Sequence, residues 1–95
     1  GLIVSKTELH PGKETGGHNH SGQEEVYIFT HGEGSMIVGT KTYDVKIGDI
    51  ILIPDGEFHK VWNEGEDDLI FIEVQCGTYF GEDDIVRLSD DYSRS

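Results

Sequence analysis

The chain has little cysteine, few basic residues and no long apolar run, and each shortage excludes a class of protein. Its single cysteine, Cys76, cannot form a disulfide within the chain, so we expect a cytoplasmic protein rather than a disulfide-stabilised secreted one. No stretch approaches the roughly 20 apolar residues that span a bilayer. Lys and Arg number 7 against 19 Asp and Glu, a formal net charge of −12, which opposes binding to nucleic acids and anionic membranes.

The chain is also short and modestly hydrophobic. Its 95 residues suffice for one domain, and 35% of them are hydrophobic. A domain of this size buries a small core and gains stability when it binds a metal or a second copy. We therefore expect a metal-bound protein, a homodimer, or both.

Short apolar runs alternate with turn residues along most of the chain. Thirteen glycines separate the runs, and no amphipathic helical pattern is sustained before residue 80. Runs of this length that are rich in Ile, Val, Phe and Tyr predict strands of an all-β barrel or sandwich. The expected strands are Leu2 to Leu9, Val26 to Phe29, Met36 to Val38, Tyr43 to Val45, Ile50 to Ile53, Val61 to Trp62 and Leu69 to Val74.

The composition changes near the C-terminus, so we expect a barrel over residues 1–80 and an acidic tail over residues 81–95. The tail is either solvated, with one helical turn at Glu82–Val86, or an arm that packs Ile85 and Leu88 on the barrel or a second subunit.

Two histidines and one glutamate lie close together in the first third of the chain. His18 and His20 are two residues apart and share one face of an extended segment. Glu25 lies at an odd offset from them, so a turn or bulge at Ser21-Gly22 is needed before it can face the same way. His59 follows much later, after the turn at residues 54–56. Three imidazoles and one carboxylate suit a divalent transition metal (Mn, Fe, Co, Ni, Cu or Zn), and the lack of thiolates excludes a cysteine-type zinc site.

Two spaced motifs resemble those of the cupin superfamily. The first is Gly12-x5-His18-x-His20-x4-Glu25-x6-Gly32, and the second is Gly48-x5-Pro54-x-Gly56-x2-His59-x3-Asn63. The resemblance covers residues 12–63 and implies a small antiparallel jelly-roll barrel. It also implies one metal in the barrel, bound by His18, His20, Glu25 and His59.

The C-terminal third is similar to the end of the type II mannose-6-phosphate isomerases. The similarity rests on residues 72–87, from Ile72 to Arg87, and on Asp90, Asp91, Tyr92 and Arg94. It implies a metal-dependent aldose–ketose isomerase that acts on a sugar phosphate. The donor set alone is equally compatible with an Fe(II) dioxygenase, and with a cupin that binds a metal or small ligand without turnover.

Further side chains are candidates for contact with a small-molecule ligand. Glu73 shares its strand face with Leu69 and Phe71, so it is either a general base inside the barrel or a strand-end acid paired with a lysine. Tyr27 and Phe29 are candidate pocket walls. Trp62 is either a third wall or a residue packed on the outer face. Arg87 either contacts a phosphate or anchors the tail.

Overall fold

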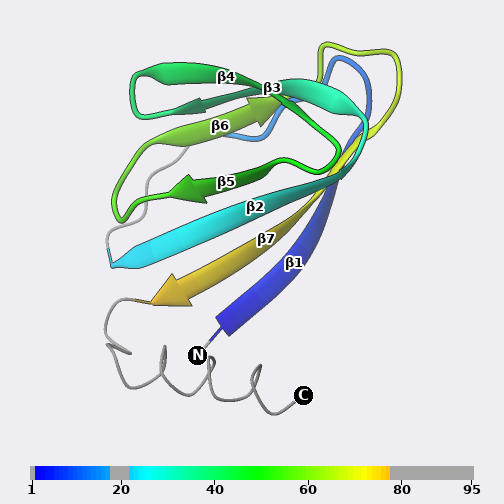
Figure 1. The fold of residues 1–95 in the computed structure, drawn as a ribbon. Coiled ribbons are helices and arrows are strands. Elements are labelled where there is room, and N and C mark those ends of the chain that lie inside the picture. The colour runs from blue at the N-terminus through cyan, green and yellow to red at the C-terminus, as the bar shows by residue number, and fades with distance from the viewer. Residues whose placement is uncertain (1, 18–21, 78–95) are drawn as a thin grey trace.

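Two antiparallel sheets face each other and enclose the interior of the barrel (Figure 1). The structure is a computed structural model that describes residues 2–17 and 22–77. The four-stranded sheet has the order β1-β7-β2-β5, and the three-stranded sheet has the order β4-β3-β6. The strands are β1 (Leu2–Leu9), β2 (Gln23–His31), β3 (Glu33–Val38), β4 (Lys41–Lys46), β5 (Ile50–Ile53), β6 (His59–Trp62) and β7 (Leu69–Gly77).

This architecture confirms the all-β prediction. Every expected apolar run lies in a strand. The described ranges contain no helix, and so none that is long and apolar enough to cross a membrane. Five strands are longer than their apolar runs, among them β2, which begins at Gln23, and β7, which continues to Gly77. The extra residues of β2 and β7 pair with each other, as in the Glu24–Cys76 and Glu25–Gln75 pairs.

The hydrophobic core lies between the two sheets. Its aromatic part comes from the four-stranded sheet, where the rings of Tyr27, Phe29 and Phe71 contact one another. The three-stranded sheet contributes Met36, Val45 and Val61, and Leu9, Ile53 and Leu69 complete the cluster. These nine side chains are few for a domain, so each contributes a large share of the stability.

Two sequence signals for turns have the expected conformations. Gly48 and Gly56 have φ angles of +93° and +80°, in the region that favours glycine. Asn63 is buried and closes the turn after β6. Its amide donates to the carbonyl oxygens of Leu9 and Asp67, both at 2.8 Å, and its Oδ1 accepts from Gly65 N at 2.9 Å. The asparagine therefore joins the end of β1 to the β6–β7 turn.

Shortening Ile53 to valine should lower the free energy of unfolding by about 0.5 to 1.5 kcal/mol, because the side chain is fully buried and the lost methyl leaves a cavity. Urea unfolding measures the change. Ile47→Val is the matched control, since Ile47 is exposed and the same change there should stay within about 0.5 kcal/mol. Equal losses at the two positions would contradict the placement of the core.

Candidate metal centre

His59 and Glu25 meet in the interior, although they come from different sheets. His59 is the first residue of β6, and Glu25 faces inward from β2. Their side chains are 1% and 3% exposed, and His59 Nε2 lies 3.0 Å from Glu25 Oε2. The inward direction of Glu25 matches the predicted turn, because Gly22 has a φ of +85° and the buried positions then alternate as 25, 27 and 29.

Hydrogen bonds orient both members of the pair. His59 Nδ1 lies 3.1 Å from the carbonyl oxygen of Glu57, which can only accept, so Nδ1 carries the proton in the neutral ring. The lone pair of Nε2 then points at the carboxylate. Gln75 Nε2 donates to Glu25 Oε1 at 3.2 Å and holds the carboxylate from the other side. Side chains that bind metals are commonly oriented by such partners.

The segment that leads to His18 runs beside β6 towards His59. Thr15 N donates to the carbonyl oxygen of Val61 at 2.8 Å, and Val61 N donates to Thr15 Oγ1 at 3.0 Å. Further on, the backbone of Gly17 packs against the ring of Phe58, where a methyl group on Gly17 would lie 2.7 Å from Cε1. A side chain at position 17 would displace the ring of Phe58, which is the residue next to His59.

Gly22 and Gln23 are held by the turn between β5 and β6. Asp55, in the turn between β5 and β6, accepts hydrogen bonds through Oδ1 from Gly22 N at 2.6 Å and from Gln23 N at 3.2 Å. Residues 18–21 are thus flanked on both sides by contacts with residues 55–58. His18, His20 and Arg87 lie outside the described residues. Within residues 2–17 and 22–77, no group of three or more His, Cys, Asp or Glu side chains is arranged to hold a metal.

Glu73 lies two residues before Gln75 on β7 and so on the same face of the strand. It is opposite Tyr27 in the β2–β7 ladder. Ser5 Oγ and Thr7 Oγ1 donate to Glu73 Oε2 at 3.1 and 3.3 Å. The carboxylate therefore faces inward and is bound by hydroxyl groups rather than by the lysine that the alternative interpretation required.

The aromatic candidates lie in two different environments. Tyr27 and Phe29 face inward, are fully buried, and pack with Phe71. Trp62 lies on the opposite face of β6 from His59, as its position in the strand predicts, and its Nε1 donates to Glu64 Oε1 at 2.6 Å.

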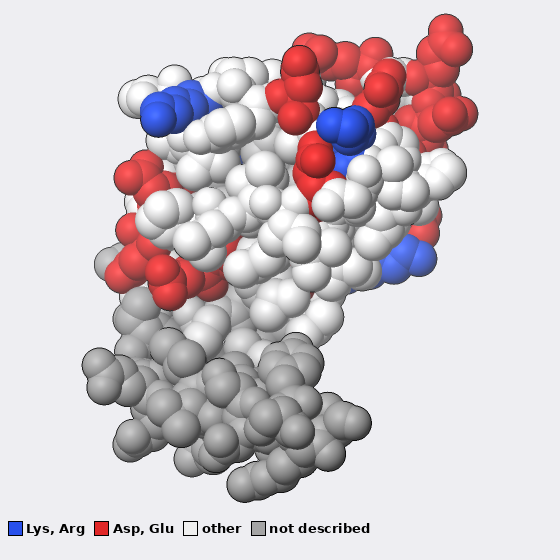
Figure 2. All heavy atoms as spheres, in the orientation of Figure 1, with Lys and Arg blue, Asp and Glu red and all other residues white. Residues whose placement is uncertain are grey.

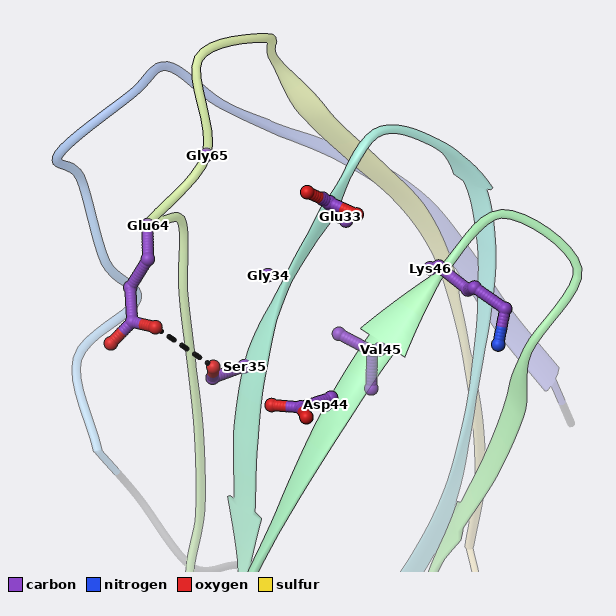
Figure 3. A pocket seen from close by; sticks show the side chains of 8 residues that line it. All are labelled: Glu33, Gly34, Ser35, Asp44, Val45, Lys46, Glu64 and Gly65. Atoms are coloured by element: carbon purple, nitrogen blue, oxygen red, sulfur yellow. Dashed lines mark hydrogen bonds between the residues drawn. The ribbon is translucent and has the colours of Figure 1, made fainter.

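A hollow of about 390 Å³ lies elsewhere, beside β3, β4 and the turn after β6 (Figure 3). Glu64 points into it and accepts a hydrogen bond from Ser35 Oγ at 3.2 Å, while Lys46 points away (Figure 3). The hollow contains neither His59 nor Glu25, and its carboxylates oppose the binding of anions. Its lining residues are Glu33, Gly34, Ser35, Asp44, Val45, Lys46, Glu64 and Gly65.

Sequence reasoning missed Asp55 and Gln75. Asp55 stands between Pro54 and Gly56 of the second motif, which is a signal of a turn but not of its hydrogen-bond partners. Gln75 shares its strand parity with Glu73 and could have been placed inside the barrel on that ground. Its contact with Glu25 depends on the register of β2 against β7, which the sequence does not show.

Burial raises the pKa of the Tyr27 phenol above its ordinary value, and the hydrogen bond to Glu73 and the charges of Glu73 and Glu25 raise it further. An unfolded tyrosine ionises near pH 10, whereas the folded one stays neutral. The stabilisation from the neutral phenol is thus complete below pH 10 and is lost as the pH rises towards the folded pKa, by up to about 1.4 kcal/mol per pH unit.

Urea unfolding between pH 8 and pH 11 tests this pH dependence. The alkaline loss of stability should be smaller in Tyr27→Phe than in the wild type. Tyr43→Phe is the control. Because Tyr43 is exposed, its replacement should leave the slope of the free energy of unfolding against pH unchanged. Identical slopes in all three proteins would show that Tyr27 ionises freely.

Comparison with known proteins agrees with the fold. The sequence matches the cupin domain family over residues 5–75. It is 32% identical over 88 residues to a mannose-1-phosphate guanylyltransferase of Sinorhizobium fredii, which is 93% of this chain and 17% of that protein. An oxalate-binding protein of Thermotoga maritima is 35% identical over 72 residues, 76% of this chain and 60% of that protein.

A solved structure shows the same arrangement of strands. The crystal structure of a predicted oxalate decarboxylase from Thermotoga maritima has a TM-score of 0.77 and 33% identity, covering 79% of this chain and 65% of that one. The chain spans less than a fifth of the guanylyltransferase and under two thirds of the oxalate-binding protein. The match over most of its length and the shared fold show that the chain belongs to the cupin family.

Proposed function

We propose that this cupin binds one divalent transition metal through His18, His20, Glu25 and His59 and uses it to hold a small oxygen-rich ligand. The observation that carries the proposal is the buried pair of His59 and Glu25. A neutral imidazole that presents a lone pair to a carboxylate is repelled by it unless a proton or a cation lies between them. A metal bound there would supply Lewis-acid polarisation of a ligand oxygen.

The separation of the two donor atoms supports the same proposal. Donors about 2.1 Å from one ion, at a right angle to each other, are about 3.0 Å apart. His59 Nε2 and Glu25 Oε2 are 3.0 Å apart. The Glu57 carbonyl and the Gln75 amide would keep both donors in this position. Gly17 and Gly22, which precede and follow residues 18–21 in the chain, both contact the turn before His59.

Replacing His59 with alanine should lower the bound metal well below one equivalent and remove most of the rise in melting temperature on adding Mn²⁺ or Co²⁺, because binding free energy adds to folding. Elemental analysis and thermal unfolding measure the two effects. His31→Ala is the matched control, since His31 is exposed at the end of β2. Equal metal content in both variants and the wild type would contradict the proposal.

The reaction we propose for this site is aldose–ketose isomerisation of a sugar phosphate, in line with the C-terminal resemblance. Such a reaction needs a base that takes a proton from the carbon beside a carbonyl and returns it to the neighbouring carbon. Glu73 fits this role because it faces inward two residues along β7 from Gln75, the partner of Glu25. Same-face neighbours on a strand are about 7 Å apart, which leaves room for a short carbon chain between Glu73 and a metal at Glu25.

Glu73→Gln tests the role of the base with a nearly isosteric change. The variant should keep its metal and lose at least about a hundredfold in kcat on mannose 6-phosphate, the usual scale of acid–base catalysis. Ser5→Ala is the control, since it removes one hydrogen bond to Glu73 but leaves the carboxylate in place. A Gln variant with wild-type kcat would exclude Glu73 as the base.

The alternative is ligand binding without turnover, which the relationship to an oxalate-binding protein favours. Oxalate has two carboxylates and would occupy two open positions of a metal. Calorimetric titration of the metal-loaded protein with oxalate and with mannose 6-phosphate separates the two functions. Tight oxalate binding without conversion of the sugar phosphate would identify a binding protein.

A further inference from the structure

The outer side of the four-stranded sheet is largely apolar. Val4, Val74, Val26 and Leu52 pair in register and form one unbroken row from β1 to β5. A second row contains Ile72, Ile28 and Ile50, and its β1 position is Lys6, which forms an exposed ion pair with Glu8 at 3.3 Å. The seven apolar side chains of the two rows, called here the apolar outer face, alternate with the inward-facing residues of the same strands.

This face is open at its edges among the described residues. Val4 is 63% exposed on β1, and Ile50 is 66% exposed on β5. Figure 2 shows a broad uncharged surface across the centre of the molecule, while acidic side chains gather at the upper right and the left margin. A sheet that meets water on one side usually alternates apolar and polar residues. Contiguous apolar surface of this kind is typical of a surface that is covered in the working protein.

The strand sequences also indicate burial on both sides. Leu69 to Ile72 of β7 and Ile50 to Ile53 of β5 are uninterrupted apolar runs, the pattern of strands covered on both faces. Only every second side chain of each run points into the interior of the barrel. The remaining side chains of these runs point outward, and burying them needs a second layer over the sheet.

We propose that residues 78–95 of the same chain cover the apolar outer face. β7 occupies a central place in the sheet, and its last outward side chain, Cys76, is followed directly by this segment. Four strands have three spacings between them, so the first and the last lie about 14 Å apart. Eighteen residues reach about 27 Å as a helix and about 60 Å when extended. The segment therefore starts beside the face and is long enough to cross it.

The composition of the segment fits this role. It combines an apolar set with acids that would remain in water. The apolar residues are Tyr79, Phe80, Ile85, Val86 and Leu88, and the acids are Glu82, Asp83, Asp84, Asp90 and Asp91. A tethered segment also acts at high effective concentration, whereas a second copy must overcome the repulsion between two chains of charge −12 each. The homodimer expected from the sequence would then use another surface, and it stays a prediction.

Cys76 is a native probe of this arrangement, because it belongs to β7 at the point where the segment begins. We would measure the rate at which N-ethylmaleimide labels the folded, full-length chain. The double variant I85S/L88S should label several-fold faster than the wild type, because it weakens the cover over the thiol. The double variant S89A/S93A is the matched control in the same segment and should label at the wild-type rate.

Hydrogen exchange tests the same contact from the sheet. Val4→Lys should accelerate exchange in peptides from residues 78–95 several-fold. Ile47→Lys makes the same substitution at a side chain that is also 63% exposed but lies between β4 and β5, off the face, and should leave these peptides unchanged. Neither experiment depends on a metal, so its outcome is independent of the proposed function.

The proposal would be overturned by either of two results. One is equal labelling of Cys76 in I85S/L88S and the wild type together with equal exchange in Val4→Lys and Ile47→Lys, which would show an uncovered face. The other is a labelling rate that rises on dilution of the wild type and is unaffected by I85S/L88S, which would show that a second copy covers the face instead.

Discussion

The structure depends on a carboxylate and an imidazole that are buried against each other between two sheets. A buried ionised carboxylate is costly unless it is paired and fully hydrogen-bonded. Glu25 Oε1 accepts a hydrogen bond from Gln75, and Oε2 faces Nε2 of His59, whose Nδ1 is held by the Glu57 carbonyl. A proton or a cation between Nε2 and Oε2 completes the pairing. Each of these residues lies on a different segment. The pair therefore requires that β2, β6, β7 and the turn before β6 meet at one point.

The interior of the four-stranded sheet changes in polarity along its length, and three cross-strand pairs describe the change. Phe29 and Phe71 pack at the apolar end, Tyr27 and Glu73 follow, and Glu25 and Gln75 are at the polar end. Because strand neighbours on one face are two residues apart, these three pairs are consecutive rows. The Phe29–Phe71 row supplies core stability, and the other two rows each place one carboxylate in the interior.

Much of this could be predicted from the sequence, and the limits have physical reasons. The strands follow from apolar runs and glycine turns, and the inward direction of Glu25 follows from strand parity and the turn at Gly22. The partners of Glu73 could not be predicted, because Ser5 and Thr7 reach it only through the register of β1 against β7. Long-range register depends on which edges pair, and local patterns do not encode it. The same reason explains why Gln75 and Asp55 were missed.

The strand β2 joins the candidate metal centre to the apolar outer face. Its residues Glu25 and Tyr27 face the interior, whereas Val26 and Ile28 face outward. A slip of one residue in its pairing would turn every side chain to the opposite face. Such a slip would expose Tyr27 and bury valine beside His59. A cover on the outer face would therefore stabilise the only register that directs Glu25 to His59, so the apolar surface and the buried pair favour the same arrangement of the sheet.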